Sequence, residues 1–226
     1  MHYGDSENPR AYKKGDRYRD ISLKKSIKLA LRRGHTDLEK DLQVLERHGK
    51  GSTYIVYALD ASGSMKGKKI EACKKAGIAL AYKAINARDK VGLIVFGQEV
   101  KEFIEPTSDF TFLLKEITRI KASAETDIVA TLRKSVEIFP SENITKHLIL
   151  ITDALPTKGI DPFKETLEEA SVARSKGITI SVIGINLDEK GKELAQKIAE
   201  IGEGKLYAVR SSENVDRIVL EDYYSI

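Results

Sequence analysis

Residues 54–65 read YIVYALDASGSM, an apolar run that ends abruptly in polar residues. Apolar side chains fill positions 54–59, and Asp60, Ser62 and Ser64 follow directly. An uninterrupted apolar run of this length is typical of a parallel strand that is covered on both faces of its sheet. The stretch therefore predicts a buried central strand with a cluster of polar side chains at its carboxyl end.

Further apolar runs follow this strand and alternate with longer segments of helical periodicity. Strands are expected at 91–96, 147–151, 178–183 and 205–209, and helices at about 70–84, 110–120, 128–139, 162–176, 189–201 and 212–223. Residues 100–104 follow a short turn and are expected to form an antiparallel edge strand. This order predicts an α/β fold, a doubly wound and mostly parallel six-stranded sheet with one antiparallel edge strand and helices on both faces.

The first fifty residues differ from the rest in charge and in pattern. They hold 13 Lys and Arg against 8 Asp and Glu, whereas the remaining residues hold 25 against 26. Apolar positions between Ile21 and Leu45 predict two short amphipathic helices that are broken at Gly34. The chain is therefore divided into a basic N-terminal extension, residues 1–50, and a sheet domain, residues 51–226. The extension is too short to bury its own apolar face, so we expect it to pack against the sheet domain or another protein.

Composition excludes several classes of protein. With 32% charged and 41% hydrophobic residues, the chain is neither disordered nor fibrous. It lacks the ~20 consecutive apolar residues of a membrane span and the apolar core of a signal peptide, so a cytoplasmic protein without a membrane partner is expected. Its single cysteine, Cys73, agrees with a reducing compartment and is expected to be a packing residue. Acidic residues interrupt the basic extension, which argues against a nucleic-acid partner.

Polar residues at the strand ends predict a metal site. In an open α/β sheet the ligand crevice lies outside the carboxyl ends of the strands. Asp60 ends the first strand, Asp153 follows the strand at 147–151, and hydroxyls come from Ser62, Ser64 and Thr126. These hard oxygen ligands suit Mg²⁺ or Mn²⁺, and no thiol or imidazole joins them to favour zinc. Because Mg²⁺ usually keeps some water, some carboxylates are expected to bind through water. The alternative is that the aspartates only cap helix N-termini.

At these residues the sequence closely resembles the von Willebrand factor A (VWA) family. The metal-ion-dependent adhesion site of that family has D-x-S-x-S after the first strand, a Thr in a later loop and an Asp after the fourth strand. This pattern matches Asp60, Ser62, Ser64, Thr126 and Asp153. The resemblance extends over about residues 52–209 and implies that an acidic residue of a protein partner coordinates the metal directly. One departure is Glu125, which stands where the family often has glycine before the Thr.

Enzymatic interpretations fit these residues less well, and we assign no catalytic residue. Ser64 lacks the flanking glycines of a nucleophile elbow, and His147 is expected at the opposite end of its strand. Residues 63–69 have three residues between their glycines where a P-loop has four, and Lys69 replaces the Ser or Thr of a P-loop. A phosphatase of the haloacid dehalogenase type needs a second Asp two residues after the first, where this chain has Ser62.

The sequence thus predicts a divalent-metal-dependent protein-binding module that is not an enzyme. Intracellular prokaryotic VWA proteins, which the chain resembles, often work with AAA+ ATPases of the MoxR or magnesium-chelatase type. The resemblance therefore implies an adaptor for such an ATPase, with the basic extension as a docking segment. The alternatives are a non-catalytic subunit of a chelatase-like complex and, as a minor rival, a metal-dependent phosphatase.

Overall fold

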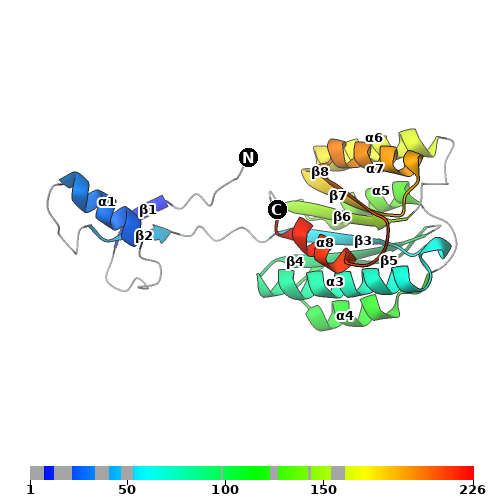
Figure 1. The fold of residues 1–226 in the computed structure, drawn as a ribbon, viewed down its shortest axis with the longest axis horizontal. Coiled ribbons are helices and arrows are strands. Elements are labelled where there is room, and N and C mark those ends of the chain that lie inside the picture. The colour runs from blue at the N-terminus through cyan, green and yellow to red at the C-terminus, as the bar shows by residue number, and fades with distance from the viewer. Residues whose placement is uncertain are drawn as a thin grey trace. The chain divides into compact units, whose positions relative to one another are not determined.

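The computed structural model describes residues 8–12, 22–33, 41–46, 53–97, 99–122, 127–141, 144–153 and 161–226. The chain divides into two compact units, Met1–Gly51 and Ser52–Ile226 (Figure 1). Each unit is described by itself, and the second contains the predicted strand-end residues.

The second unit is built on a six-stranded sheet with the order β5-β4-β3-β6-β7-β8. The strands are β3 (Tyr54–Asp60), β4 (Lys90–Phe96), β5 (Val100–Thr107), β6 (Lys146–Thr152), β7 (Ile178–Ile185) and β8 (Glu203–Val209). Neighbouring strands run parallel, except that β5 pairs antiparallel with β4 at the edge. The predicted fold class, including the antiparallel edge strand, is confirmed.

Helices cover both faces of this sheet (Figure 1). One face carries α3 (Lys68–Asn86), α4 (Phe110–Arg119) and α8 (Val215–Tyr223), and the other carries α5 (Ile128–Ile138), α6 (Pro162–Ser175) and α7 (Glu189–Ile201). The short 3-10 helix η2 (Gly63–Met65) connects β3 to α3. Two separate apolar cores result, one on each side of the sheet.

Local signals set most of the helix ends. Asp161 caps α6 by accepting a hydrogen bond from the backbone N–H of Lys164 at 3.2 Å, and Pro162 is the first helical residue. The helix ends before Gly177, whose φ of +76° is readily adopted only by glycine. By contrast, α8 begins at Val215 rather than near residue 212, because Asn214 takes the left-handed conformation immediately before it.

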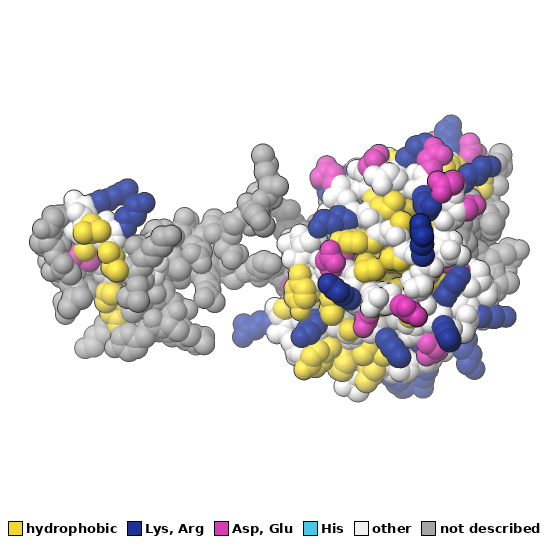
Figure 2. Space-filling model, viewed as in Figure 1, with side chains coloured by type: hydrophobic (Ala, Val, Ile, Leu, Met, Phe, Trp, Pro, Cys, Tyr) yellow, Lys and Arg dark blue, Asp and Glu magenta, His cyan; other side chains and the backbone are white. Residues whose placement is uncertain are grey.

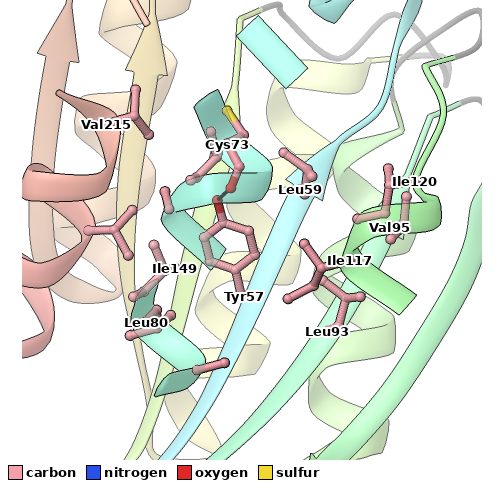
Figure 3. Close-up of a cluster of buried hydrophobic side chains, with 14 of the residues drawn as sticks. Tyr57, Leu59, Cys73, Leu80, Leu93, Val95, Ile117, Ile120, Ile149 and Val215 are labelled. Carbon is pink, nitrogen blue, oxygen red and sulfur yellow. Dashed lines mark hydrogen bonds between the residues drawn. The ribbon is translucent and has the colours of Figure 1, made fainter. Parts of the chain in front are cut away.

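The central strand β3 supplies side chains to both cores. Tyr57 and Leu59 face α3, whereas Val56 and Ala58 face the opposite layer, as the alternation of a strand requires. Figure 3 shows Tyr57 beside Cys73 of α3, and the Tyr57 hydroxyl donates to the Cys73 carbonyl at 2.5 Å. Burial raises the pKa of the Cys73 thiol to about 12, so this cysteine is a packing residue and not a thiolate.

The first unit contains a two-stranded antiparallel ribbon and one helix. The strands β1 (Asn8–Ala11) and β2 (Gln43–Glu46) pair with each other, and α1 (Leu23–Arg33) lies between them in the chain. Ser26 of α1 ties the helix to the ribbon, since its hydroxyl accepts from the backbone N–H of Gln43 at 2.8 Å. Ile27 and Leu31 of α1 are exposed.

The strand β2 differs from the second helix that is expected in the extension. The spacing of Leu42 and Leu45 fits one face of a helix, but residues 43–46 pair through their backbone with residues 8–11. This pairing joins segments more than thirty residues apart, which local periodicity does not detect.

The surface of the second unit mixes both signs of charge. On the face shown in Figure 2, Lys and Arg side chains alternate with Asp and Glu side chains. None of the helices in the described part of the chain has both the length and the apolar character that crossing a bilayer requires.

Candidate metal centre

Two neighbouring strands bring the predicted carboxylates to one edge of the sheet. β3 and β6 pair in parallel with Leu59 opposite Ile151, so Asp60 and Thr152 follow at the same level. Asp153 follows directly after the last residue of β6. Asp60 is fully buried, and the side chain of Asp153 is 1% exposed. Two carboxylates are therefore held almost out of water at the carboxyl edge.

Both oxygens of Asp60 accept hydrogen bonds. Oδ1 accepts from the backbone N–H of Ser62 at 2.8 Å, and Oδ2 accepts from the hydroxyl of Thr152 at 2.6 Å. Burial raises the pKa of Asp60 above its ordinary value, hydrogen bonds from Thr152 and Ser62 oppose the rise, and the nearby charge of Asp153 adds to it. A cation placed here would relieve the cost of the buried negative charge.

The turn after β3 brings two hydroxyls toward the second carboxylate. Met65, which is fully buried, anchors η2 and leaves Ser64 on the exposed side. Ser64 Oγ donates to Asp153 Oδ1 at 2.6 Å, and the hydroxyl oxygens of Ser62 and Ser64 lie 3.0 Å apart. Because the hydrogen of Ser64 is directed at Asp153, Ser62 is the donor to Ser64 in this pair. One chain of hydrogen bonds thus connects the β3 turn to the end of β6.

A lysine completes the contacts of Asp153. Lys69 Nζ lies 2.5 Å from Asp153 Oδ2, and 31% of the lysine side chain is exposed. Lys69 belongs to the first turn of α3, directly after η2. Both oxygens of Asp153 are therefore engaged, one by a hydroxyl and one by an ammonium group.

Thr126, the fifth predicted ligand, and Glu125 before it lie outside the described residues. Their neighbour Asp127 is described and caps α5, since its carboxylate accepts from the backbone N–H of Ala130 at 2.8 Å. The backbone N–H of Asp127 donates to the carbonyl of Gly97 at 2.7 Å, and Gly97 follows directly after β4. The residue next to Thr126 is thus attached to the same edge of the sheet as Asp60.

The donor set fits a hard divalent cation better than a soft one. In the part of the chain that the structure describes, no group of three or more His, Cys, Asp and Glu side chains is arranged to hold a metal. A metal bound here would therefore need the hydroxyls beside Asp60 and Asp153, and such all-oxygen sets suit Mg²⁺ and Mn²⁺. Helix capping does not account for Asp153, because its oxygens contact the side chains of Ser64 and Lys69.

The histidine of the sheet unit belongs to a different cluster. His147 Nε2 lies 2.7 Å from Asp222 Oδ2, and the hydroxyl of Ser181 donates to Asp222 Oδ1 at 2.8 Å. His147 is the second residue of β6, at the amino end of the strand. As the sequence predicts, it lies at the opposite end of the sheet from Ser64.

Sequence reasoning missed two residues of the candidate site. Thr152 orients Asp60 through its hydroxyl, and its position directly before Asp153 at a strand end was the available signal. Lys69 contacts Asp153, yet in the sequence it appears only as one of several lysines after Ser64. Nothing local distinguishes Lys69 from Lys68.

The fold and this cluster define a class of protein, a doubly wound α/β domain with carboxylates and hydroxyls at the carboxyl edge of its central strands. Residues 55–155 match the family model of the von Willebrand factor type A domain. This part of the sheet unit is therefore similar to the VWA domain.

Known proteins are similar to this chain at low identity over stretches longer than residues 55–155. The chain is 25% identical over 182 residues to the magnesium-chelatase 67 kDa subunit of Heliobacterium mobile, covering 74% of this chain and 27% of that protein. It is 27% identical over 169 residues to an uncharacterized protein of Methanocaldococcus jannaschii, covering 66% of this chain and 97% of that protein. The chain thus spans only 27% of the length of the chelatase subunit.

A solved structure supports the fold assignment. The structure described as von Willebrand factor type A from Catenulispora acidiphila superposes with a TM-score of 0.65 at 17% identity, covering 76% of this chain and 42% of that chain. At this identity the likeness concerns the fold alone.

Proposed function

We propose that the sheet unit is a VWA domain that binds Mg²⁺ or Mn²⁺ at its carboxyl edge and presents the metal to an Asp or Glu side chain of a protein partner. The observation that carries the proposal is the contact between Ser64, from the turn after β3, and Asp153, from the end of β6, at 2.6 Å. This contact brings donors 89 residues apart in the sequence into one cluster. Asp60 and Ser62 belong to the same chain of hydrogen bonds, and Thr126 is proposed as the fifth ligand.

The charges of this donor set favour a further acidic ligand. Two carboxylates balance the charge of a divalent ion, and the hydroxyls add oxygen donors without adding charge. When bound, the metal would offer a Lewis-acidic position that an additional carboxylate oxygen can fill. The protein's own residues hold and orient the cation, and Ser64 is the exposed one through which a partner would approach.

We further propose that the partner is an AAA+ ATPase of the MoxR or magnesium-chelatase type, for which this chain is an adaptor. The similarity to the magnesium-chelatase subunit of Heliobacterium mobile supports this proposal, as does the basic N-terminal extension with its exposed Ile27 and Leu31. The same similarity favours the second candidate, a non-catalytic subunit of a chelatase-like complex.

Calorimetric titration of the metal-free protein with Mg²⁺ and with Mn²⁺ tests the metal site. We expect one binding event per chain, and an affinity that is about tenfold lower in Ser64→Ala, because this variant loses one hydroxyl at an exposed position. Ser171→Ala, an exposed serine of α6, is the matched control and should bind like the wild type. Absence of heat with either metal, in protein with a normal melting curve, would contradict the proposal.

Capture of partners from native lysate tests the binding function. Proteins retained by the immobilised wild type should be lost in EDTA, return when Mg²⁺ is restored, and be depleted on Ser64→Ala. Retention of the same proteins in EDTA would show that partner binding does not depend on the metal. Hydrolysis of a general phosphatase substrate by the isolated protein would favour the phosphatase alternative instead.

A further inference from the structure

We propose that Lys69 is a tethered cation that competes with the divalent metal for Asp153 and thereby sets the metal affinity of the site. The inference rests on the proposed function. Lys69 Nζ lies 2.5 Å from Asp153 Oδ2, while Ser64 occupies the other oxygen of the same carboxylate. The ammonium group thus supplies a positive charge to a carboxylate that is 1% exposed.

The geometry makes the ammonium group and a metal mutually exclusive at Asp153 Oδ2. A divalent ion bound to this oxygen would lie within a few ångströms of the Lys69 nitrogen. Two like charges at such a distance repel strongly where little water screens them. A metal that takes Asp153 Oδ2 as a direct ligand therefore displaces Lys69 from that oxygen.

Lys69 is placed so that it can leave without a change of fold. Its backbone belongs to the first turn of α3, while 31% of its side chain is already exposed. Rotation about the four-carbon stem can carry the ammonium group into solvent while the helix stays in place. A cation also gains nothing from the positive end of the helix dipole, so the contact with Asp153 is the main interaction that holds Lys69 inward.

The adjacent Lys68 provides a matched control. Lys68 has the same charge as Lys69 and precedes it by one residue in the first turn of α3. Lys68 is exposed, and the structure gives it no contact with Asp153. Lys69→Gln and Lys68→Gln both remove one positive charge from the start of α3. Only the first removes the competitor of the metal.

Titration of metal-free wild type, Lys69→Gln and Lys68→Gln with Mg²⁺ tests the inference. Lys69→Gln should bind about tenfold more tightly than the wild type, equivalent to about 1.4 kcal/mol, and Lys68→Gln should change the affinity by less than about twofold. Equal or weaker binding by Lys69→Gln, or an equal gain in Lys68→Gln, would overturn the inference. If neither the wild type nor Lys69→Gln binds Mg²⁺, the proposed function fails as well.

Amine labelling of the wild type provides a readout without any substitution. An acylating reagent reacts with amines that it can reach, and the contact with Asp153 engages the Lys69 amine. Mass spectrometry of labelled peptides should show that Mg²⁺ increases the labelling of Lys69 relative to Lys68. A ratio that does not change, at a Mg²⁺ concentration that saturates the titration, would show that the metal binds without displacing Lys69.

Discussion

Asp60→Asn is expected to lower the Mg²⁺ affinity at least about a hundredfold, while the domain stays at least as stable as the wild type at neutral pH. The asparagine oxygen can accept from the backbone N–H of Ser62, and its NH₂ group can donate to the Thr152 hydroxyl, so the local hydrogen bonds survive. What is lost is a buried negative charge. A metal site depends on that charge, whereas the metal-free fold does not.

The pH dependence of stability separates this explanation from a general loss of structure. Burial raises the pKa of Asp60 in the folded protein, so folding favours the protonated form of this group. Burial of the ionised Asp60 therefore lowers the free energy of unfolding of the wild type. This loss is complete above the raised pKa and disappears as the pH falls below the ordinary pKa near 3.8. Asp60→Asn lacks this loss, so its advantage over the wild type should shrink as the pH falls from 7 toward 4.

Calorimetric titration and urea unfolding at several pH values measure the two effects together. Glu221→Gln, an exposed carboxylate near the end of α8, is the control and should keep wild-type metal affinity. Unchanged Mg²⁺ affinity in Asp60→Asn would falsify the site assignment. A large loss of stability at pH 7 would show instead that the ionised carboxylate is needed to hold the turn after β3.

Asp222→Ala is expected to lower the free energy of unfolding by about 3 kcal/mol, roughly 6–12 °C in melting temperature for a domain of this size. The Asp222 side chain is 1% exposed and contacts both His147 and Ser181. Its removal would leave His147 and the hydroxyl hydrogen of Ser181 without this buried acceptor and would remove the hydrogen bonds that link α8 to β6 and β7. Mg²⁺ binding by the folded fraction should not change, because His147 lies at the opposite end of β6 from the candidate site.

Thermal and urea unfolding of Asp222→Ala measure this cost. Glu221→Ala, the exposed neighbour on the same helix, should change stability by no more than about 0.5 kcal/mol. A loss below about 1 kcal/mol in Asp222→Ala would mean that water or a rearranged side chain satisfies His147 and Ser181.

Much of the sheet domain could be predicted because its signals are local. The run 54–59 predicts a central strand from burial on both faces, and Asp161, Pro162 and Gly177 predict the ends of α6 from backbone chemistry. In the N-terminal extension the same logic predicts a helix where residues 43–46 form a strand. This prediction fails because the backbone of β2 pairs with β1, a strand that is distant in the sequence.

The same distinction between local signals and contacts of distant residues applies to the candidate site. Asp60, Ser62 and Ser64 lie within five residues, so one turn places them together, and Asp153 could be added because parallel strands end at a common edge. The structure brings Asp60, Ser62, Ser64 and Asp153 into one hydrogen-bonded cluster, and metal binding by these residues and Thr126 stays a prediction. The roles of Thr152 and Lys69 depend on contacts with residues 92 and 84 positions away.

The sequence by itself determined that this chain forms a doubly wound sheet with acids and hydroxyls at one edge, since apolar periodicity and strand ends are encoded by adjacent residues. Only the tertiary structure decided that Lys69, and not Lys68, reaches Asp153. Successive residues of a helix point in directions about 100° apart, and only packing against the sheet determines which of the two faces the carboxylate.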